Sequence, residues 1–87
     1  MVKGQIVCSI AGRDKGSFLM VVEDRGESVL LCDGKARPLQ RPKLKNKKHV
    51  KTISCVIDQR TVTGNKTLRR LLNEKVNGLP KEENKNV

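Results

Sequence analysis

Aromatic side chains are almost missing from this chain. Of its 87 residues one is Phe, and none is Trp or Tyr. Domains that grip single-stranded nucleic acid stack the bases on several aromatic rings, and grooves that bind proline-rich peptides are also lined with such rings. The composition therefore disfavours both kinds of site. We expect the one ring, Phe18, to pack in the hydrophobic core.

Long apolar runs are also missing. No stretch reaches the roughly 18 apolar residues of a membrane span, and the N-terminal residues lack the apolar region of a signal peptide. The basic residues are not combined with the long apolar helical face that binding to a membrane surface requires. We therefore expect a cytoplasmic protein that does not bind membranes. The odd number of cysteines, each in an apolar stretch, predicts buried reduced thiols at Cys8, Cys32 and Cys55.

Recognisable catalytic or metal-binding patterns are lacking as well. The chain has a single histidine, His49, and shows no Ser-His-Asp order, carboxylate pair or phosphate-binding glycine loop. A zinc site built from His49 and the cysteines is disfavoured, because zinc ligands usually come in closely spaced pairs and these cysteines are far apart. We expect no enzymatic activity, catalytic residue, metal, cofactor or small-molecule substrate.

Positive charge is what the sequence has in excess. The formal net charge is +10, and residues 34–57 hold eight Lys or Arg residues without a carboxylate. Like charges in one segment repel one another, and they are usually tolerated because a polyanion neutralises them. The charge therefore predicts a nucleic-acid partner. Because aromatic rings are scarce, we expect structured RNA, recognised through its phosphates, 2′-hydroxyls and shape.

Short apolar runs separated by glycine-bearing turns predict a mainly β fold, either a small barrel or a sandwich. The Asp33-Gly34 pair is typical of a two-residue hairpin turn, so the residues after it should return as a strand. Pro38 lacks an amide donor and would place that strand at a sheet edge. The expected strands are residues 5–10, 17–23, 28–32, 35–39 and 50–57.

A helix is expected over residues 65–76, where leucines recur at helical spacing. Thr63 or Asn65 would cap its start, and Gly78 would end it in the left-handed conformation. The leucine stripe allows two roles, packing on the sheet or docking on another protein. In the second case Lys66, Arg69 and Arg70 would add to the RNA surface. The stripe comprises Leu68, Leu71, Leu72 and Val76.

Three sequence features resemble the KOW motif, a hairpin shared by several ribosomal proteins and by the NusG-type transcription factors. They are the start Gly4-Gln5-Ile6-Val7, the turn Gly12-Arg13-Asp14-Lys15-Gly16 and the return Met20-Val21. Leu19 departs from the family, which often has a glycine at that position. The resemblance implies a KOW domain with a five-stranded SH3-like barrel over residues 1–60. The C-terminal α-helix would lie within 61–79 and a disordered tail within 80–87.

The resemblance also implies that the hairpin turn and neighbouring loops bind RNA. Arg13 and Lys15 would project from the hairpin tip, and Asp14 between them is expected to accept hydrogen bonds from turn amides. Pro38 and Pro42 favour an extended basic loop over residues 35–49. Its predicted RNA contacts are Lys35, Arg37, Arg41, Lys43, Lys45, Asn46, Lys47, Lys48 and His49.

The sequence thus predicts a non-enzymatic RNA-binding protein, associated with the ribosome in the cytoplasm and bound to ribosomal RNA. Ribosomal proteins are a further expected partner, through Leu68, Leu71 and Leu72. The alternative is a KOW-type protein-interaction module that acts on the transcription or translation machinery. A surface of solvated charges without a partner is the third possibility.

Overall fold

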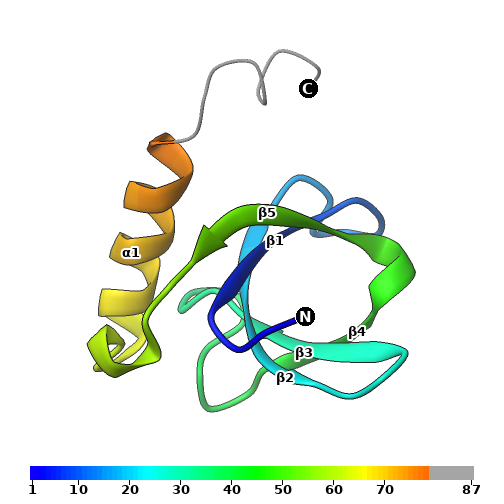
Figure 1. Ribbon diagram of the computed structural model, residues 1–87, viewed down its shortest axis with the longest axis horizontal. Helices are drawn as coiled ribbons and strands as arrows, with labels where there is room; N and C mark the ends of the chain where they lie inside the picture. The colour runs from blue at the N-terminus through cyan, green and yellow to red at the C-terminus, as the bar shows by residue number, and fades with distance from the viewer. Residues whose placement is uncertain (79–87) are drawn as a thin grey trace.

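The computed structural model describes residues 1–78 and shows one curved antiparallel sheet with a helix beside it (Figure 1). The five strands have the order β4-β3-β2-β1-β5. Their bounds are β1 Gln5–Ser9, β2 Phe18–Asp24, β3 Ser28–Cys32, β4 Lys43–Asn46 and β5 Val50–Val56. Two single 3₁₀ turns, η1 Lys47–His49 and η2 Gln59–Thr61, and the helix α1 Asn65–Asn77 complete the chain. The expected tail over 80–87 lies outside the described residues.

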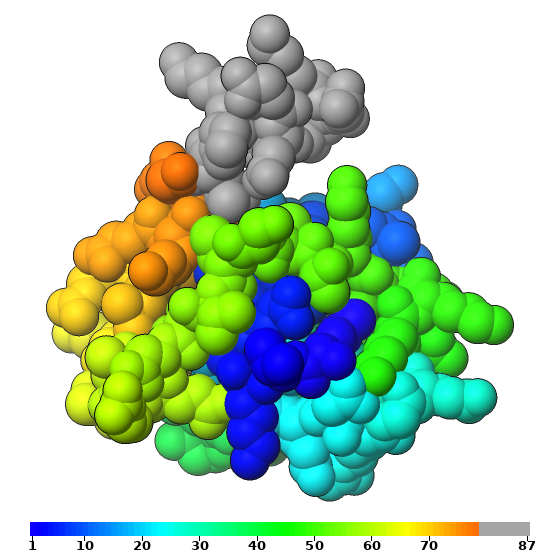
Figure 2. All heavy atoms as spheres, in the orientation of Figure 1, coloured from blue at the N-terminus to red at the C-terminus, as the bar shows by residue number. Residues whose placement is uncertain are grey.

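The mainly β class and the C-terminal helix are confirmed. The edge strands β4 and β5 are joined by η1, but within residues 1–78 they do not pair with each other. The sheet is therefore not closed into a barrel. Its curvature encloses one face, on which the N-terminal residues lie between the β2–β3 hairpin and β5 (Figure 2).

The core has two layers because both faces of the sheet are covered. Successive strand residues point to opposite faces, so neighbours such as Ile6 and Val7 are both buried, each in a different cluster. This explains why the strands appear as continuous apolar runs. The cluster on the enclosed face comprises Val7, Leu19, Val21, Val29, Leu31 and Val50. The cluster on the helix side comprises Ile6, Met20, Cys32, Ile57, Leu68 and Leu72.

Helix α1 lies against the sheet through its leucine stripe. Leu68 and Leu72 are buried in the helix-side cluster, and Leu71 packs at its margin. The predicted N-cap is wrong, because Gly64 occupies that position and no side chain caps the helix. Gly78 is the C-cap as predicted, but its backbone is right-handed, with φ −84°, and not left-handed.

Instead of capping the helix, Asn65 joins it to residues 33–42. Its Oδ1 accepts a hydrogen bond from the Leu39 amide at 2.7 Å, and its Nδ2 donates to Gln40 Oε1 at 2.8 Å. These bonds hold the loop after β3 against the first turn of α1. Gly34 lies so close to the Asn65 carbonyl that a β-carbon would clash with it, and its φ of +80° also favours glycine.

The predicted strand over residues 35–39 is wrong, because a tight loop forms there. Asp33 Oδ1 accepts hydrogen bonds from the amides of Lys35 and Arg37, both at 2.8 Å. The amides of Asp33 and Gly34 donate to the Arg37 carbonyl. The backbone groups that would form the hydrogen bonds of a β-ladder are thus already bonded within the loop, and Pro38 has no amide hydrogen to donate.

The fourth strand is Lys43–Asn46, which pairs with β3 in the register Ser28 to Asn46 and Leu31 to Lys43. The expected extended loop over residues 35–49 is therefore only partly correct. Residues 33–42 form a loop, and a strand and a 3₁₀ turn follow it.

The remaining expectations concern the cysteines and membrane segments. All three cysteines are free; Cys32 is buried, whereas Cys8 and Cys55 are half-buried. Burial, with a smaller effect from the neighbouring Asp33 carboxylate, raises the pKa of the Cys32 thiol to about 11. Within residues 1–78 no helix has the length and apolar character to cross a membrane.

Removing the Leu68 side chain tests the packing of α1 on the sheet. Leu68→Ala should lower the free energy of unfolding by about 2–5 kcal/mol, because it leaves a cavity in the helix-side cluster. Leu44→Ala is the matched control. Because Leu44 on β4 is 52% exposed, this variant should lose far less free energy of unfolding. Urea unfolding followed by circular dichroism measures both. Equal losses in the two variants would contradict this packing.

Candidate nucleic-acid interface

Residues 11–16, here called the basic turn, connect β1 to β2. The Gly16 amide donates to the Ser9 carbonyl at 2.8 Å, and the Ser9 amide donates to the Ser17 carbonyl at 2.9 Å. These bonds continue the β1–β2 ladder up to the turn. Arg13 and Lys15 are exposed at the tip of the hairpin.

A buried ion pair fixes the basic turn to β4. Asp14 Oδ1 accepts hydrogen bonds from Lys45 Nζ at 2.6 Å and from Ser9 Oγ at 2.8 Å. Lys45 Nζ also donates to the Ala11 carbonyl at 2.9 Å, and its side chain is only 7% exposed. The expectation that Asp14 accepts bonds from turn amides is therefore wrong. Lys45, predicted as an RNA contact, is instead buried beneath the turn.

The Asp14 carboxylate is held in its charged form. Partial burial opposes ionisation, but hydrogen bonds from Lys45 and Ser9, with the charges of Lys45 and Lys43, outweigh it and lower the Asp14 pKa to about 2. Lys43 Nζ is 3.9 Å from Asp14 Oδ2, an oxygen that has no hydrogen-bond partner in the described part of the chain. Two lysines of β4 therefore form ion pairs with one carboxylate of the turn.

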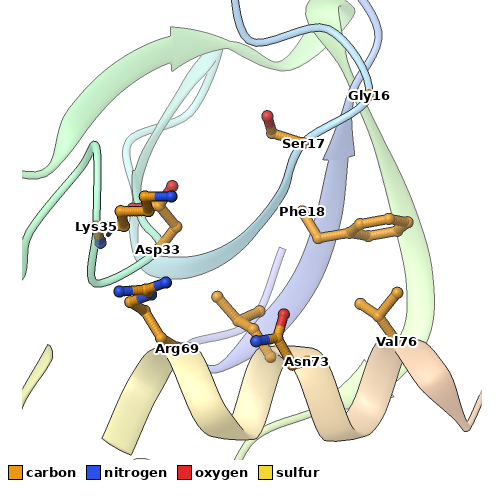
Figure 3. Close-up of a pocket in the computed structure, with 9 residues that line it drawn as sticks. Gly16, Ser17, Phe18, Asp33, Lys35, Arg69, Asn73 and Val76 are labelled. Atoms are coloured by element: carbon orange, nitrogen blue, oxygen red, sulfur yellow. Dashed lines mark hydrogen bonds between the residues drawn. The ribbon is translucent and has the colours of Figure 1, made fainter. Parts of the chain in front are cut away.

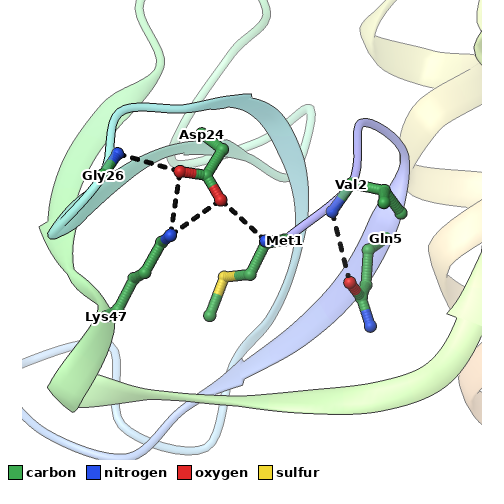
Figure 4. Close-up of polar contacts among 6 residues, drawn as sticks. All are labelled: Met1, Val2, Gln5, Asp24, Gly26 and Lys47. Carbon is green, nitrogen blue, oxygen red and sulfur yellow. Dashed lines mark hydrogen bonds and ion pairs between the residues drawn. The ribbon is translucent and has the colours of Figure 1, made fainter.

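A second carboxylate, Asp24 at the end of β2, binds Lys47 at the start of η1. Asp24 binds Lys47 Nζ at 2.7 and 2.8 Å and the Met1 ammonium at 2.7 Å, and it accepts the Gly26 amide (Figure 4). Hydrogen bonds from Lys47, the N-terminus and Gly26 lower the pKa of Asp24 well below its usual range. Lys47 thus has an intramolecular partner. Asn46 has one too, because its Oδ1 accepts the Lys48 amide at the start of η1.

Two open clefts lie between the basic turn, the loop after β3 and α1. One, of about 270 Å³, includes Arg13 and Arg37 in its lining, and the other, of about 290 Å³, includes Lys35 and Arg69. Ser17 and Asp33 line both clefts, so the two clefts lie next to each other. We call them together the basic groove; Figure 3 shows the part that adjoins α1.

The basic groove carries a clear excess of positive charge. Within residues 1–78, none of its four cationic side chains has an ion-pair partner. Asp14, which also lines the groove, is neutralised by Lys45, and Asp33 already accepts two amides through Oδ1. The cations are Arg13, Lys35, Arg37 and Arg69.

The structure brings together only part of the predicted surface. Arg13, Lys35 and Arg37 meet in the groove, whereas Lys15 and Arg41 are exposed outside its lining. Lys48 and His49 are exposed in η1, and Lys48 lines a separate cleft with Glu27, Asn46 and Lys47. The predicted basic surface is therefore divided into two regions.

Arg69 and Asn73 also line the groove. The sequence assigns Arg69 to RNA only in the alternative role of the helix, and it gives no reason to single out Asn73. No periodicity in the sequence reveals their position, because it depends on the long-range bonds that hold Asn65 to the loop after β3. Within residues 1–78, no three His, Cys, Asp or Glu side chains are grouped so as to hold a metal ion.

Replacing Asp14 tests the anchor of the basic turn. A carboxylate whose pKa is lower in the folded state than in the unfolded state stabilises the fold. This stabilisation is fully present when the pH is above the ordinary pKa of 3.8, and it is lost as the pH falls toward about 2. Asp14→Asn should therefore lower the free energy of unfolding by about 2 kcal/mol at neutral pH, and the difference from wild type should shrink below pH 4.

Urea unfolding at a series of pH values measures this difference. Asp58→Asn is the control, because the Asp58–Arg60 pair is exposed and such pairs contribute little. A loss from Asp14→Asn that does not change between neutral pH and about 2 would show that the carboxylate charge is not its cause.

Comparison with known proteins identifies no family for this chain. No protein-family model matches the chain, and no curated protein is similar to it.

Proposed function

We propose that this protein binds structured RNA through the basic groove, and that this RNA is ribosomal RNA. The observation that carries the proposal is the convergence of four cationic side chains from three separate segments on one groove. Charges of one sign that face a shared cleft raise the local potential and attract a polyanion. A chain with net charge +10 reinforces that attraction over longer distances.

The groove chemistry suits a phosphate backbone. Arg13 and Arg37 offer planar guanidinium groups that can bind a phosphate through two hydrogen bonds, whereas Lys35 acts as a mobile point charge. The supporting backbone is already ordered by the Asp14–Lys45 pair and the Asp33 loop. Binding would therefore require little further ordering of the chain, which favours affinity.

We also propose that the protein is a ribosome-associated member of the KOW group with an SH3-like fold. A strongly curved five-stranded sheet and a glycine-flanked basic turn between its first two strands support this assignment. Leu19 replaces the glycine that the family often has, and its side chain packs in the enclosed cluster. The core therefore accommodates the Leu19 side chain, and Leu19 lies outside the turn over residues 11–16.

Protein docking through the leucine stripe receives no support from the packing of α1. Leu68 and Leu72 are buried against the sheet, and Leu71 is half-buried at the margin of the same cluster. A partner could reach Leu68 and Leu72 only if the helix left the sheet. RNA binding needs no such rearrangement, because the cations of the groove are already open to solvent.

Titration of a structured RNA hairpin with the purified protein tests the role of the groove. The logarithm of the affinity should fall linearly with the logarithm of salt concentration, by roughly 0.7–0.9 per phosphate neutralised. Arg13→Ala and Arg37→Ala should each weaken binding about tenfold at low salt and reduce this slope by about 1.

Arg60→Ala is the matched control for these variants. Arg60 is exposed, paired with Asp58 and outside the groove lining, so this change should leave the slope nearly unchanged. Affinity that does not vary between low and moderate salt would contradict the proposal, as would equal losses in all three variants.

Sedimentation of a cell lysate tests the association with ribosomes. The protein should travel with ribosomal particles at low salt and leave them after ribonuclease treatment or in high salt, because the contacts are made to RNA phosphates. The wild-type protein is compared with Arg13→Ala/Arg37→Ala. Persistence on nuclease-treated protein particles would instead favour a protein-interaction module.

A further inference from the structure

The part of the basic groove beside α1 differs from the rest because it has an apolar end. Phe18 packs against the helix-side core cluster, as expected, but it is only half-buried, and it lines this cleft together with Val76 and the buried Leu72. Figure 3 shows Phe18 and Val76 next to each other at one end, and Lys35 and Arg69 at the other. Asn73 lies between the two ends.

We propose that this cleft receives one unpaired nucleobase of a structured RNA, while the phosphates beside that base lie along the basic groove. This inference rests on the proposed RNA-binding function and specifies which feature of the RNA the site selects. The RNA feature is a bulged or looped-out nucleotide next to a helix, where a base is free to leave the stack.

The lining of the cleft matches the surfaces of a base. A nucleobase has apolar faces and a polar edge, and proteins bind such bases with aromatic rings, guanidinium planes and side-chain amides. Phe18 and Val76 offer apolar contact, and the Arg69 guanidinium offers a flat cationic surface. The Asn73 amide carries a donor and an acceptor side by side, which suits a base edge.

These polar groups are available for a ligand. Within the described residues, the side chains of Arg69 and Asn73 make no hydrogen bond, and Asn73 is exposed on the helix. The neighbouring Arg70 differs, because its guanidinium lies 3.9 Å from Glu74 and it does not line the cleft.

The size of the cleft suits one base. Its volume of about 290 Å³ is just below the range that is typical of small-molecule sites. One aromatic side chain cannot provide the successive stacking contacts of a single-strand binding domain. A single extruded base therefore agrees with the composition of the chain, whereas a long unpaired strand does not.

Four RNA hairpins with a single bulged A, C, G or U, and one fully paired hairpin, provide the test. Wild-type protein should bind at least one bulged hairpin about tenfold more tightly than the paired hairpin, which corresponds to one base contact. Phe18→Leu and Asn73→Ala should each remove this preference, whereas Arg13→Ala, which acts on a phosphate contact, should weaken binding to bulged and paired hairpins alike and preserve the preference. Asn77→Ala, one turn further along α1 and outside the cleft lining, should keep it.

The controls separate the possible failures. Thermal unfolding checks Phe18→Leu for misfolding, and Asn73→Ala at an exposed position provides an independent variant. Equal affinity for bulged and paired hairpins, still dependent on salt and on Arg13, would overturn the base site and leave the RNA-binding function intact. Absence of binding to all five hairpins would overturn both.

Free nucleoside monophosphates, titrated separately, distinguish a nucleotide site from an RNA site. Their binding should be at least about a hundredfold weaker than that of the bulged hairpin, because they lack the neighbouring phosphates that the groove contacts. Equal affinity for a monophosphate and the bulged hairpin would overturn the assignment to RNA.

Discussion

The placement of the basic turn depends on one ion pair, between Asp14 and Lys45. A six-residue turn with two glycines would otherwise have considerable conformational freedom, since glycine loses more entropy on ordering than any other residue. Lys45 crosses from β4 to reach both the Asp14 carboxylate and the Ala11 carbonyl. The turn is thereby held at a fixed position relative to the sheet, and Arg13 is presented from an ordered backbone.

The same principle applies to the other walls of the groove. Asp33 organises the loop after β3 by accepting two amides, and Asn65 fastens that loop to α1. Three segments that are far apart in the sequence thus meet through hydrogen bonds made by short polar side chains. The exposed cations contribute charge to the groove, but buried or half-buried polar groups determine where those cations lie.

Local patterns in the sequence predict most of the strands and the helix, but not the long-range hydrogen bonds that place the cations. Glycine-bearing turns and apolar runs located β1, β2, β3 and β5 closely, and the leucine spacing located α1. The sequence does not reveal the fourth strand, because Lys43 and Lys45 fit a basic loop equally well and period-2 alternation is hard to detect over four residues. The Asp33-Gly34 pair predicts a hairpin, but the Asp33 side chain bonds the following amides and prevents the return strand.

The positive charge of the sequence predicts Arg13, Lys35 and Arg37 as RNA contacts, and the structure places these three around the groove. The sequence does not show which of the other predicted residues lie with them. Nothing local in the sequence distinguishes Lys45, which is buried under the turn, from Lys48, which is exposed. That distinction arises from the pairing of β4 with β3, a long-range property.

Lys45 has a further consequence for the solution behaviour of the protein. It is an inward-pointing charge on an edge strand, and such charges discourage a second molecule from adding its own strand to the sheet. Beside it, Leu44 is exposed on the same short strand. With an apolar residue in place of Lys45 the edge strand would lose this charge, and we expect strand addition to β4, and with it fibre growth, to become easier.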